Sequence, residues 1–457
     1  MNKKTTLIAA MLLSAACSMQ AQIEVKESET DNDELTIQNE EGDEEEVTFP
    51  EAMTYNLDSL LSEYMPQTYL SQDNDCQMTS DDPVFSKEEY IDRLTRIPSV
   101  MELSYNDVVR KFIDRYTGRL RHSISYMLGA ANFYMPIFEE ALEAYQLPLE
   151  LKYLPVIESA LNPTAVSRVG ATGLWQFMIG TAKQYDLEVN SLVDERRDPV
   201  KSSYAAARYL SDLYRIFGDW NLVIAAYNCG PDNINKAIHR AGGENKDYWY
   251  IYPYLPKETR GYVPAFIAAN YVMNYYCEHN ICPMTTRLPV KTDTVVINRQ
   301  LHLKQIAAVL DLDINMVRAL NPELRRDVAP GNSSPITIRL AQSDITRFID
   351  MQDSIFNYNT SELLPKRIET SINDDVPTVS RRKSARNQRS SRNRSRRSRD
   401  EATASSGSKN GKSTITIRRG DTLGSIAKRN GTTISELKRL NNLKDSKIRA
   451  GQSIKVR

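Results

Sequence analysis

The sequence is poor in the residues that hold metal ions. Its 457 residues include only 5 cysteines and 4 histidines. No two of them have the spacing of a zinc site, so we expect neither a metal ion nor a cofactor. Neither sign of charge predominates over the whole chain. The net charge of -1 by itself indicates no class of charged partner.

Long hydrophobic runs are missing after the first residues. The apolar stretch at residues 7–16 follows two lysines and is too short to span a bilayer comfortably. It predicts an export signal over residues 1–21, and hence a protein in the periplasm or associated with the outer membrane. Two processing routes stay open. Residues 13–17 resemble a lipobox, which would place a lipid anchor at Cys17. Cleavage after Ala21 would instead release the protein.

The remaining cysteines are too few for a disulfide framework. In an exported protein they can still form single bridges. Cys277 and Cys282 are five residues apart, and two interpretations stay open. They form a short loop bridge, or they are free thiols at the end of a helical domain.

Charge is concentrated in two segments of opposite sign. Residues 24–46 hold twelve acidic residues and one lysine, whereas residues 381–399 hold ten arginines and lysines and no acid. Such segments bury too little apolar surface to fold. We therefore predict an acidic disordered tail at residues 22–86 and a Ser/Arg-rich linker at residues 346–412. In an exported chain, the basic run favours a solvated tether, or contact with anionic wall polymers or lipid, and we expect no nucleic acid partner.

Residues 87–285 have the pattern of a mainly α domain. Apolar residues recur at helical spacing in residues 108–116, 204–217 and 263–276. Residues 137–145 show the same spacing directly after Pro136, which suits the first turn of a helix. No alternating strand pattern interrupts this region.

The C-terminal part of the chain contains an internal repeat. Five positions recur at an offset of 120 residues; they are Ile297, Leu303, Ile306, Ile314 and Leu320, matched by Ile417, Leu423, Ile426, Ile434 and Leu440. Each copy reads strand, helix, helix, strand. We therefore expect two small α+β modules of βααβ type, at residues 290–345 and 413–457.

One carboxylate stands out in the helical domain. Glu158 lies in an apolar run that Asn162 and Pro163 end, and a Gly-rich turn follows at residues 170–173. Burial disfavours the charged form of a carboxylate and raises its pKa, so Glu158 is a candidate general acid. The alternative is a surface glutamate followed by an ordinary helix stop. The downstream acids Asp194, Glu195 and Asp198 lie beside two arginines and are expected to brace helices.

Five separated pieces of the domain resemble a known family. They are ES at 158–159, Ser167, GATGLWQFM at 170–178, AYN at 226–228 and ETRGYVP at 258–264. In this order they resemble the soluble lytic transglycosylase (SLT) domain, and the C-terminal copy resembles a LysM domain. The chain as a whole is similar to the D-class membrane-bound lytic murein transglycosylases. The resemblance implies a lysozyme-like (goose-type) SLT domain at 87–285, a degenerate LysM-like module at 290–345 and a LysM domain at 413–457.

The resemblance also implies a reaction. Lytic transglycosylases cleave the β-1,4 bond between N-acetylmuramic acid and N-acetylglucosamine in peptidoglycan. Glu158 would protonate the leaving oxygen, the substrate's N-acetyl group would stabilise the cationic centre, and the C6 hydroxyl would attack C1. The product would be a 1,6-anhydromuramyl end. A lysozyme-like hydrolase on the same fold and a non-catalytic wall-binding scaffold remain alternatives.

Further residues receive roles by the same resemblance. The expected substrate-binding residues are Ser159, Ser167, Gln176, Phe177, Met178, Tyr227, Asn228, Glu258 and Tyr262. For Ser159, a hydrogen bond at the helix end is an equal alternative, and for the two tyrosines the alternative is buried packing. The expected glycan-binding residues of the LysM domain are Gly420, Asp421, Thr422, Leu423 and Ile448. We expect the protein to act as a monomer on peptidoglycan strands.

Overall fold

The structure is a computed structural model. It describes residues 34–38, 44–55, 60, 70–71, 76, 78–79, 81–243, 247–364, 414–417, 426–427, 432–441, 443 and 453–456. The chain forms two compact units, residues 1–380 and 381–457. The export signal, the Cys17 anchor and the five expected LysM glycan-binding residues lie outside the described residues.

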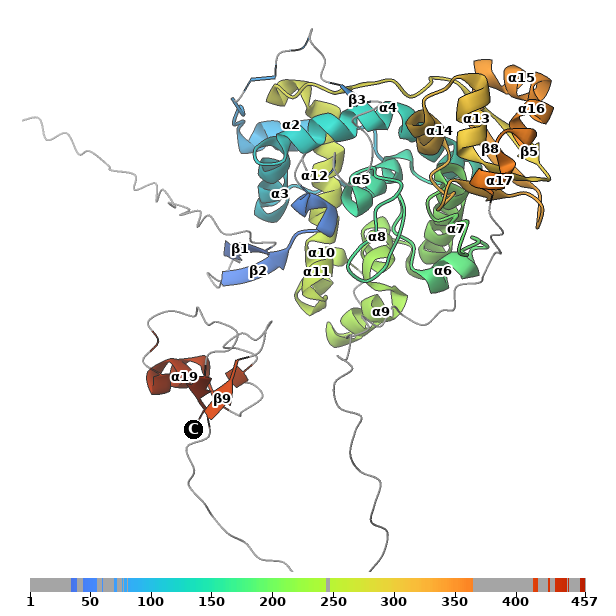
Figure 1. Cartoon of the computed structure of the whole chain (residues 1–457). Coiled ribbons are helices and arrows are strands. Elements are labelled where there is room, and N and C mark those ends of the chain that lie inside the picture. Colours follow the sequence, from blue (N-terminus) through green and yellow to red (C-terminus); the bar gives the residue numbers. More distant parts are fainter. Residues whose placement is uncertain are drawn as a thin grey trace, which may run out of the picture. The chain divides into compact units, whose positions relative to one another are not determined.

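The first unit is built around a helical domain, which confirms the mainly α prediction (Figure 1). Its longer helices are α2 (Lys87–Arg96), α3 (Asp107–Thr117), α4 (Arg121–Ala144), α7 (Pro199–Phe217), α8 (Trp220–Cys229), α9 (Pro231–Arg240) and α12 (Tyr262–Tyr275). Shorter elements are η3 (Leu149–Tyr153), α5 (Leu154–Ser159), α6 (Ile179–Gln184), α10 (Tyr248–Ile251), η4 (Tyr252–Tyr254), α11 (Lys257–Arg260), η5 (Cys277–His279) and β4 (Thr285–Thr286). None of the described helices has the length and apolarity needed to cross a membrane.

Helix α12 forms the centre of this domain. Twelve of its residues are buried, and it packs against α3, α5 and α8. One helix prediction in this domain is wrong: no helix begins at Pro136, which lies inside the 24-residue α4. The missing N–H and ring clash cost about 3 kcal/mol. Burial of α4 residues on both sides of the proline offsets this cost. The local sequence pattern does not reveal this burial, so it does not show that the helix continues through Pro136.

Part of the predicted acidic tail is folded, which corrects that prediction. Strands β1 (Glu34–Gln38) and β2 (Glu44–Thr48) pair antiparallel, and the short helix η1 (Glu51–Thr54) follows. Phe49 is buried, its ring centroid 4.8 Å from that of Phe112 on α3. Val47, Ala52 and Met53 join the same core. These few apolar residues show no helical or strand period in the sequence. They fold because α3, α5 and α11 supply the apolar surface against which they pack.

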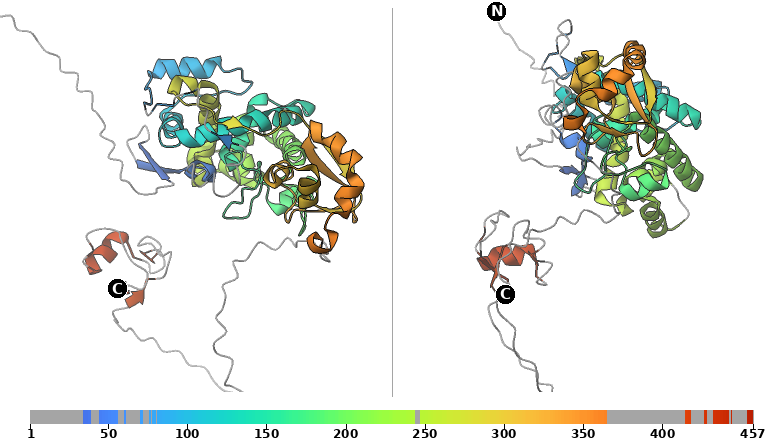
Figure 2. Two further views of the ribbon diagram at one scale, coloured as in Figure 1. Left: turned by 45° about the horizontal axis from the view of Figure 1, so that its top comes forward. Right: turned by 45° about the vertical axis from the view of Figure 1, so that its right-hand side comes forward.

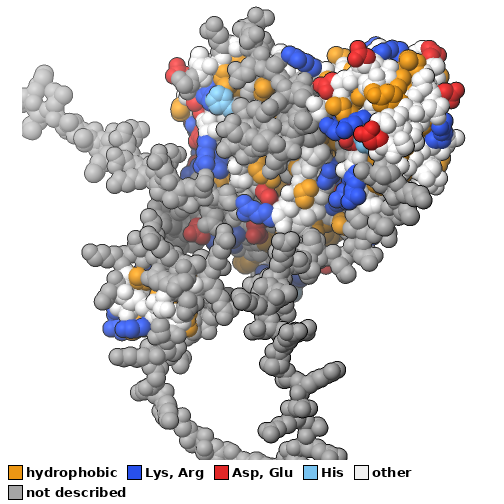
Figure 3. Space-filling model, in the orientation of Figure 1, with side chains coloured by type: hydrophobic (Ala, Val, Ile, Leu, Met, Phe, Trp, Pro, Cys, Tyr) orange, Lys and Arg blue, Asp and Glu red, His pale blue; other side chains and the backbone are white. Residues whose placement is uncertain are grey.

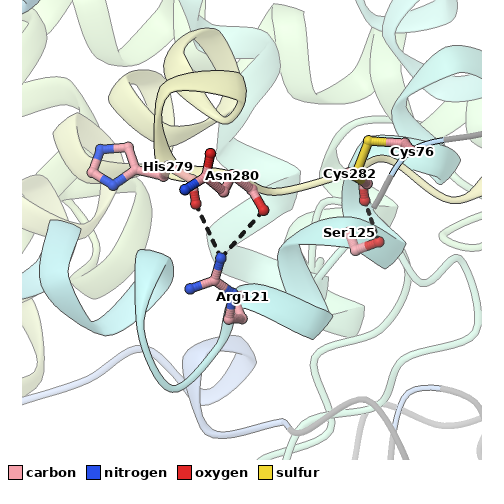
Figure 4. Close-up of a disulfide and its surroundings, with 6 residues drawn as sticks. All are labelled: Cys76, Arg121, Ser125, His279, Asn280 and Cys282. Carbon is pink, nitrogen blue, oxygen red and sulfur yellow. Dashed lines mark hydrogen bonds between the residues drawn. A yellow bond between two sulfur atoms is a disulfide. The ribbon is translucent and has the colours of Figure 1, made fainter. Parts of the chain in front are cut away.

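A disulfide fastens the end of this segment. Cys76 bonds Cys282, 206 residues later (Figure 4). Cys277 is free. The short Cys277–Cys282 bridge is therefore wrong. Nearby, β3 (Leu70–Ser71) pairs with β4. Arg121 donates from Nη2 to the carbonyl oxygens of His279 and Asn280, at 3.0 and 3.2 Å, and holds the same turn.

The first copy of the repeat lies on the helical domain in the same unit. It contains β5 (Thr292–Ile297), β6 (Gln300–His302), α13 (Leu303–Leu310), α14 (Ile314–Leu320), β7 (Val328–Pro330) and β8 (Ile336–Ala341). Helices α15 (Gln342–Asp350), α16 (Gln352–Asn357) and α17 (Thr360–Leu363) follow. Phe348, Ile355 and Phe356 are buried in the core of the copy, so it extends beyond the predicted end at residue 345. We call residues 291–356 the module (gold to orange in Figure 2).

The two copies share a structural device. In the module, Asn321 Nδ2 donates to the Arg339 carbonyl and Asn321 Oδ1 accepts from the Arg339 N–H, both at 2.8 Å. In the second unit, Asn441 makes the same two bonds to Lys455, at 2.8 and 2.7 Å. This unit contains β9 (Thr414–Thr416), α19 (Ile434–Asn441) and β10 (Ser453–Lys455), with β9 and β10 antiparallel. The asparagine that ends the second helix therefore ties it to the last strand in both copies.

Candidate active site

Glu158 lies near the end of the six-residue helix α5. The helix stops at Ser159 because Ala160 and Leu161 both adopt left-handed backbone, with φ of 51° and 60°. Around Glu158, Val156, Ile157, Ala160 and Leu161 are fully buried. The chain thus holds a half-buried carboxylate at the end of an apolar helix, as the sequence predicts.

The environment of Glu158 changes its proton affinity. Burial raises the pKa of its carboxyl from 4.5 to about 7, while a hydrogen bond from the Tyr262 hydroxyl to Oε1 lowers the pKa in part. Tyr262 begins α12 and is itself buried. A carboxyl that titrates near neutral pH can both give and take a proton at that pH.

Two tyrosines lie beside this carboxyl. Burial, together with the charge of Glu158, raises the pKa of Tyr227 and of Tyr262 well above 10, so both hydroxyls stay protonated. Tyr227 donates to the Trp175 carbonyl at 2.8 Å, and its ring lies 5.3 Å from that of Tyr209. Tyr227 therefore ties α8 to the segment after the Gly-rich turn, while Tyr262 contacts the acid directly.

We call residues 165–178 the site loop. Thr172 pairs with Val166 and with Phe177, which folds the loop back on itself. Ser167 Oγ accepts from the Ala171 N–H at 3.0 Å. Gln176 has a φ of 48° and donates from Nε2 to the Gly173 carbonyl at 2.8 Å. Ser167 and Gln176 thus stabilise the conformation of the site loop.

The structure brings only some of the predicted substrate-binding residues to the surface. Met178, Asn228 and Glu258 are exposed, and Ser167, Gln176 and Tyr227 are half-buried. Ser159, Phe177 and Tyr262 are 0%, 3% and 1% exposed, which contradicts direct contact with a substrate. The Ser159 hydroxyl lies 2.9 Å from the Leu174 carbonyl and 3.0 Å from that of Pro155. It joins α5 to the site loop, which is the helix-end alternative.

The downstream acids brace the fold, as expected. Asp194 forms a two-pronged ion pair with Arg196, at 2.8 and 2.9 Å. Asp198 caps α7 by accepting from the Val200 N–H at 2.8 Å. Glu195 pairs with Lys201 rather than with an arginine. Among the described residues, no group of three His, Cys, Asp or Glu side chains is placed to hold a metal ion.

Sequence reasoning missed the partner of the site loop. Arg196 Nη1 donates to the carbonyls of Gly170 and Phe177, at 3.3 and 3.2 Å. Gly173 has a φ of +89°, and a Cβ there would lie 1.8 Å from the Arg196 carbonyl oxygen. Arg196 is visible in the sequence as one of two neighbouring arginines. Its carbonyl acceptors lie 19 and 26 residues away, and no local sequence pattern indicates these contacts.

Comparisons with known proteins match this layout. The Transglycosylase SLT domain family matches residues 135–250, and the LysM domain family matches residues 415–457. A third family, described as the LysM-like domain of lytic transglycosylase MltD, matches residues 291–356. The order of the three matches is the order of the helical domain, the module and the second unit.

Individual relatives cover different shares of the chain. Membrane-bound lytic murein transglycosylase D of Escherichia coli K12 is 26% identical over 359 residues, which is 78% of this chain and 70% of the relative. The soluble lytic murein transglycosylase of the same strain is 32% identical over 124 residues, 26% of this chain and 19% of the relative. The crystal structure of the 70 kDa soluble lytic transglycosylase of E. coli aligns with 32% of this chain and 25% of its own, with 28% identity and a TM-score of 0.28.

Proposed function

This chain belongs to the family of D-class lytic transglycosylases, and from that premise we propose that Glu158 acts alone as the acid and base of peptidoglycan cleavage. The enzyme is a peptidoglycan lytic transglycosylase with a lysozyme-like SLT domain and LysM-type modules. The observation that carries the proposal is the half-buried Glu158 carboxyl, which has a pKa of about 7 and accepts a hydrogen bond from Tyr262.

In the proposed reaction the proton moves from the Glu158 carboxyl to the glycosidic oxygen, and the bond from that oxygen to C1 breaks. The substrate's N-acetyl carbonyl stabilises C1. The C6 hydroxyl then bonds to C1 and returns its proton to Glu158. No water is consumed, and the product is a 1,6-anhydro-N-acetylmuramyl end.

The support for this route is that the three acids downstream of the site loop are engaged elsewhere. Asp194 and Glu195 are occupied by Arg196 and Lys201, and Asp198 caps a helix. An inverting hydrolase needs a second carboxylate to activate water. Ser167, Gln176, Met178, Tyr227, Asn228 and Glu258 would hold the sugar, and such positioning favours intramolecular attack. Tyr262, which is buried, would act on Glu158 instead.

The product tests this proposal. We expect digested peptidoglycan to carry 1,6-anhydromuramyl ends, each one water lighter than its lysozyme counterpart and resistant to borohydride. Mass spectrometry of the muropeptides measures this directly. Reducible, hydrated ends alone would establish the lysozyme-like hydrolase, and binding of sacculi without any cleavage would establish the scaffold.

We further propose that the LysM domain at residues 413–457 binds glycan strands through Gly420, Asp421, Thr422, Leu423 and Ile448. Residues 346–412 would then contain the tether, beginning after α17. We also propose that the protein is exported, that it works as a monomer at the periplasmic or outer-membrane surface, and that Cys17 carries a lipid unless cleavage occurs after Ala21. The name of the membrane-bound E. coli relative supports this placement.

The LysM proposal predicts a loss confined to wall binding. Gly420→Asp, or deletion of residues 413–457, should weaken the pull-down of the protein with insoluble peptidoglycan. Turnover of short soluble fragments should stay unchanged, because a tethered second site raises local concentration without altering the chemistry. The deleted residues lie within the separate second unit. An unchanged pull-down would show that the wall is held elsewhere.

A further inference from the structure

The module has an unexpected neighbour. The segment at residues 188–198 leaves the helical domain, enters the module and returns to begin α7; we call it the bridging segment. Its Leu192 and Val193 are 2% and 3% exposed and belong to the apolar core of the module, not to that of the helical domain. In Figures 1 and 2 the module lies against the helical domain on the side of α7.

Backbone pairing reinforces this contact. Val193 pairs with Leu324 of the module as an antiparallel bridge. The Asp194 N–H donates to the Glu323 carbonyl at 2.9 Å, and the Arg325 N–H donates to the Leu192 carbonyl at 2.8 Å. The Arg325 side chain adds a bond from Nη1 to the Asn190 carbonyl at 3.2 Å. The bridging segment is therefore held against residues 323–325 by an isolated antiparallel bridge and the hydrogen bonds beside it.

The position of this contact within the module is informative. Residues 323–325 lie between α14 and β7, in the loop that joins the second helix of the module to its last strands. In this module that loop pairs with the chain's own bridging segment. The module also packs on the helical domain through α14, whose Ala319 and Leu320 belong to the helical core.

The bridging segment continues directly to the site loop. Asp194, fixed by Glu323, forms the ion pair with Arg196, and both side chains are at most 6% exposed. Arg196 donates to the carbonyl of Gly170, where the Gly-rich turn begins, and to that of Phe177, four residues after the turn. The contacts thus run from the module through Asp194 and Arg196 to the site loop that carries Gln176.

We propose that the module is a clamp that positions the site loop through the bridging segment. The inference goes beyond the proposed function, in which the module has no role. On the face of the module that Figure 3 shows, acidic and basic side chains are interspersed.

The test compares two truncations in the same apolar core of the full-length protein. Leu324 is 5% exposed and pairs with the bridging segment, whereas Ile355 is 0% exposed and lies on α16, which packs on α13 and α15. Leu324→Ala should speed amide hydrogen exchange in residues 165–178 and raise KM for short soluble peptidoglycan fragments, with kcat/KM falling roughly tenfold. Ile355→Ala should speed exchange within the module only. Leu324→Met, which conserves volume, should restore both readouts.

Each other outcome overturns the clamp. Exchange in residues 165–178 that Leu324→Ala leaves unchanged would show that the contact does not reach the site loop. Equal effects of Leu324→Ala and Ile355→Ala would show a general loss of stability. Weaker binding of sacculi with unchanged fragment turnover and exchange would show a glycan-binding module. Hydrogen exchange needs no activity, so a failure of the proposed reaction leaves this test intact.

Discussion

Glu158→Gln should reduce turnover on the order of 10²–10⁴-fold while the protein still folds and binds glycan. The amide preserves the shape of the side chain but cannot cycle a proton. Clearing of purified sacculi measures the activity, and co-sedimentation with sacculi measures binding. Glu88→Gln, at an exposed glutamate on α2, is the matched control and should clear sacculi as the wild type does. Wild-type clearing by Glu158→Gln would remove Glu158 from the reaction.

The same substitution should stabilise the protein at neutral and alkaline pH. The pKa of Glu158 is about 7 in the folded protein and 4.5 ordinarily, so the folded state binds more protons between these values. The contribution of the Glu158 carboxyl to the free energy of unfolding is therefore fully present below pH 4.5, and it is lost as the pH rises through about 7. The difference corresponds to roughly 3 kcal/mol. Urea unfolding should show Glu158→Gln equal to wild type near pH 4 and more stable at pH 8. Equal stability at both pH values would contradict a buried, neutral carboxyl.

Arg196→Met should cost about 3–5 kcal/mol of unfolding free energy, because it leaves the Asp194 carboxylate buried without its main partner. Asp194 is 2% exposed and Arg196 is 6% exposed, so water does not replace the lost bonds. The carbonyls of Gly170 and Phe177 lose a donor in the same change. Activity should fall with stability, because the site loop loses the side chain that bonds its Gly170 and Phe177 carbonyls together. Urea unfolding, monitored by fluorescence, measures the loss of unfolding free energy.

Two variants calibrate this result. Arg197→Met removes a neighbouring arginine whose Nε lies 3.9 Å from Asp194, and it should cost much less. The double variant Asp194→Leu with Arg196→Met should regain part of the loss, since it removes both buried charges together. A single Arg196→Met variant within 1 kcal/mol of wild type would show that the pair is dispensable, contrary to the general cost of an unpaired buried charge.

The sequence by itself determined the properties that rest on local pattern. Helical spacing identified α3, α7 and α12, and the 120-residue offset identified two βααβ modules whose asparagines, Asn321 and Asn441, make matching bonds. An apolar run around one carboxylate identified Glu158, because burial of a charge is visible wherever apolar residues surround it in the chain. These features depend on neighbours within a few residues, and the period of a helix or strand reports them directly.

Only the tertiary structure decided which distant residues meet. Cys282 bonds Cys76 rather than Cys277, and Phe49, in an acidic segment, enters the helical core. Ser159 lies inside the molecule although it adjoins Glu158, since α5 turns it toward the Leu174 carbonyl. Val193 belongs to the core of a module that begins about a hundred residues later. Each contact joins surfaces that complement each other only after the chain has folded. Arg196 donates to backbone carbonyls, and because every residue has a carbonyl, the sequence does not indicate which ones accept.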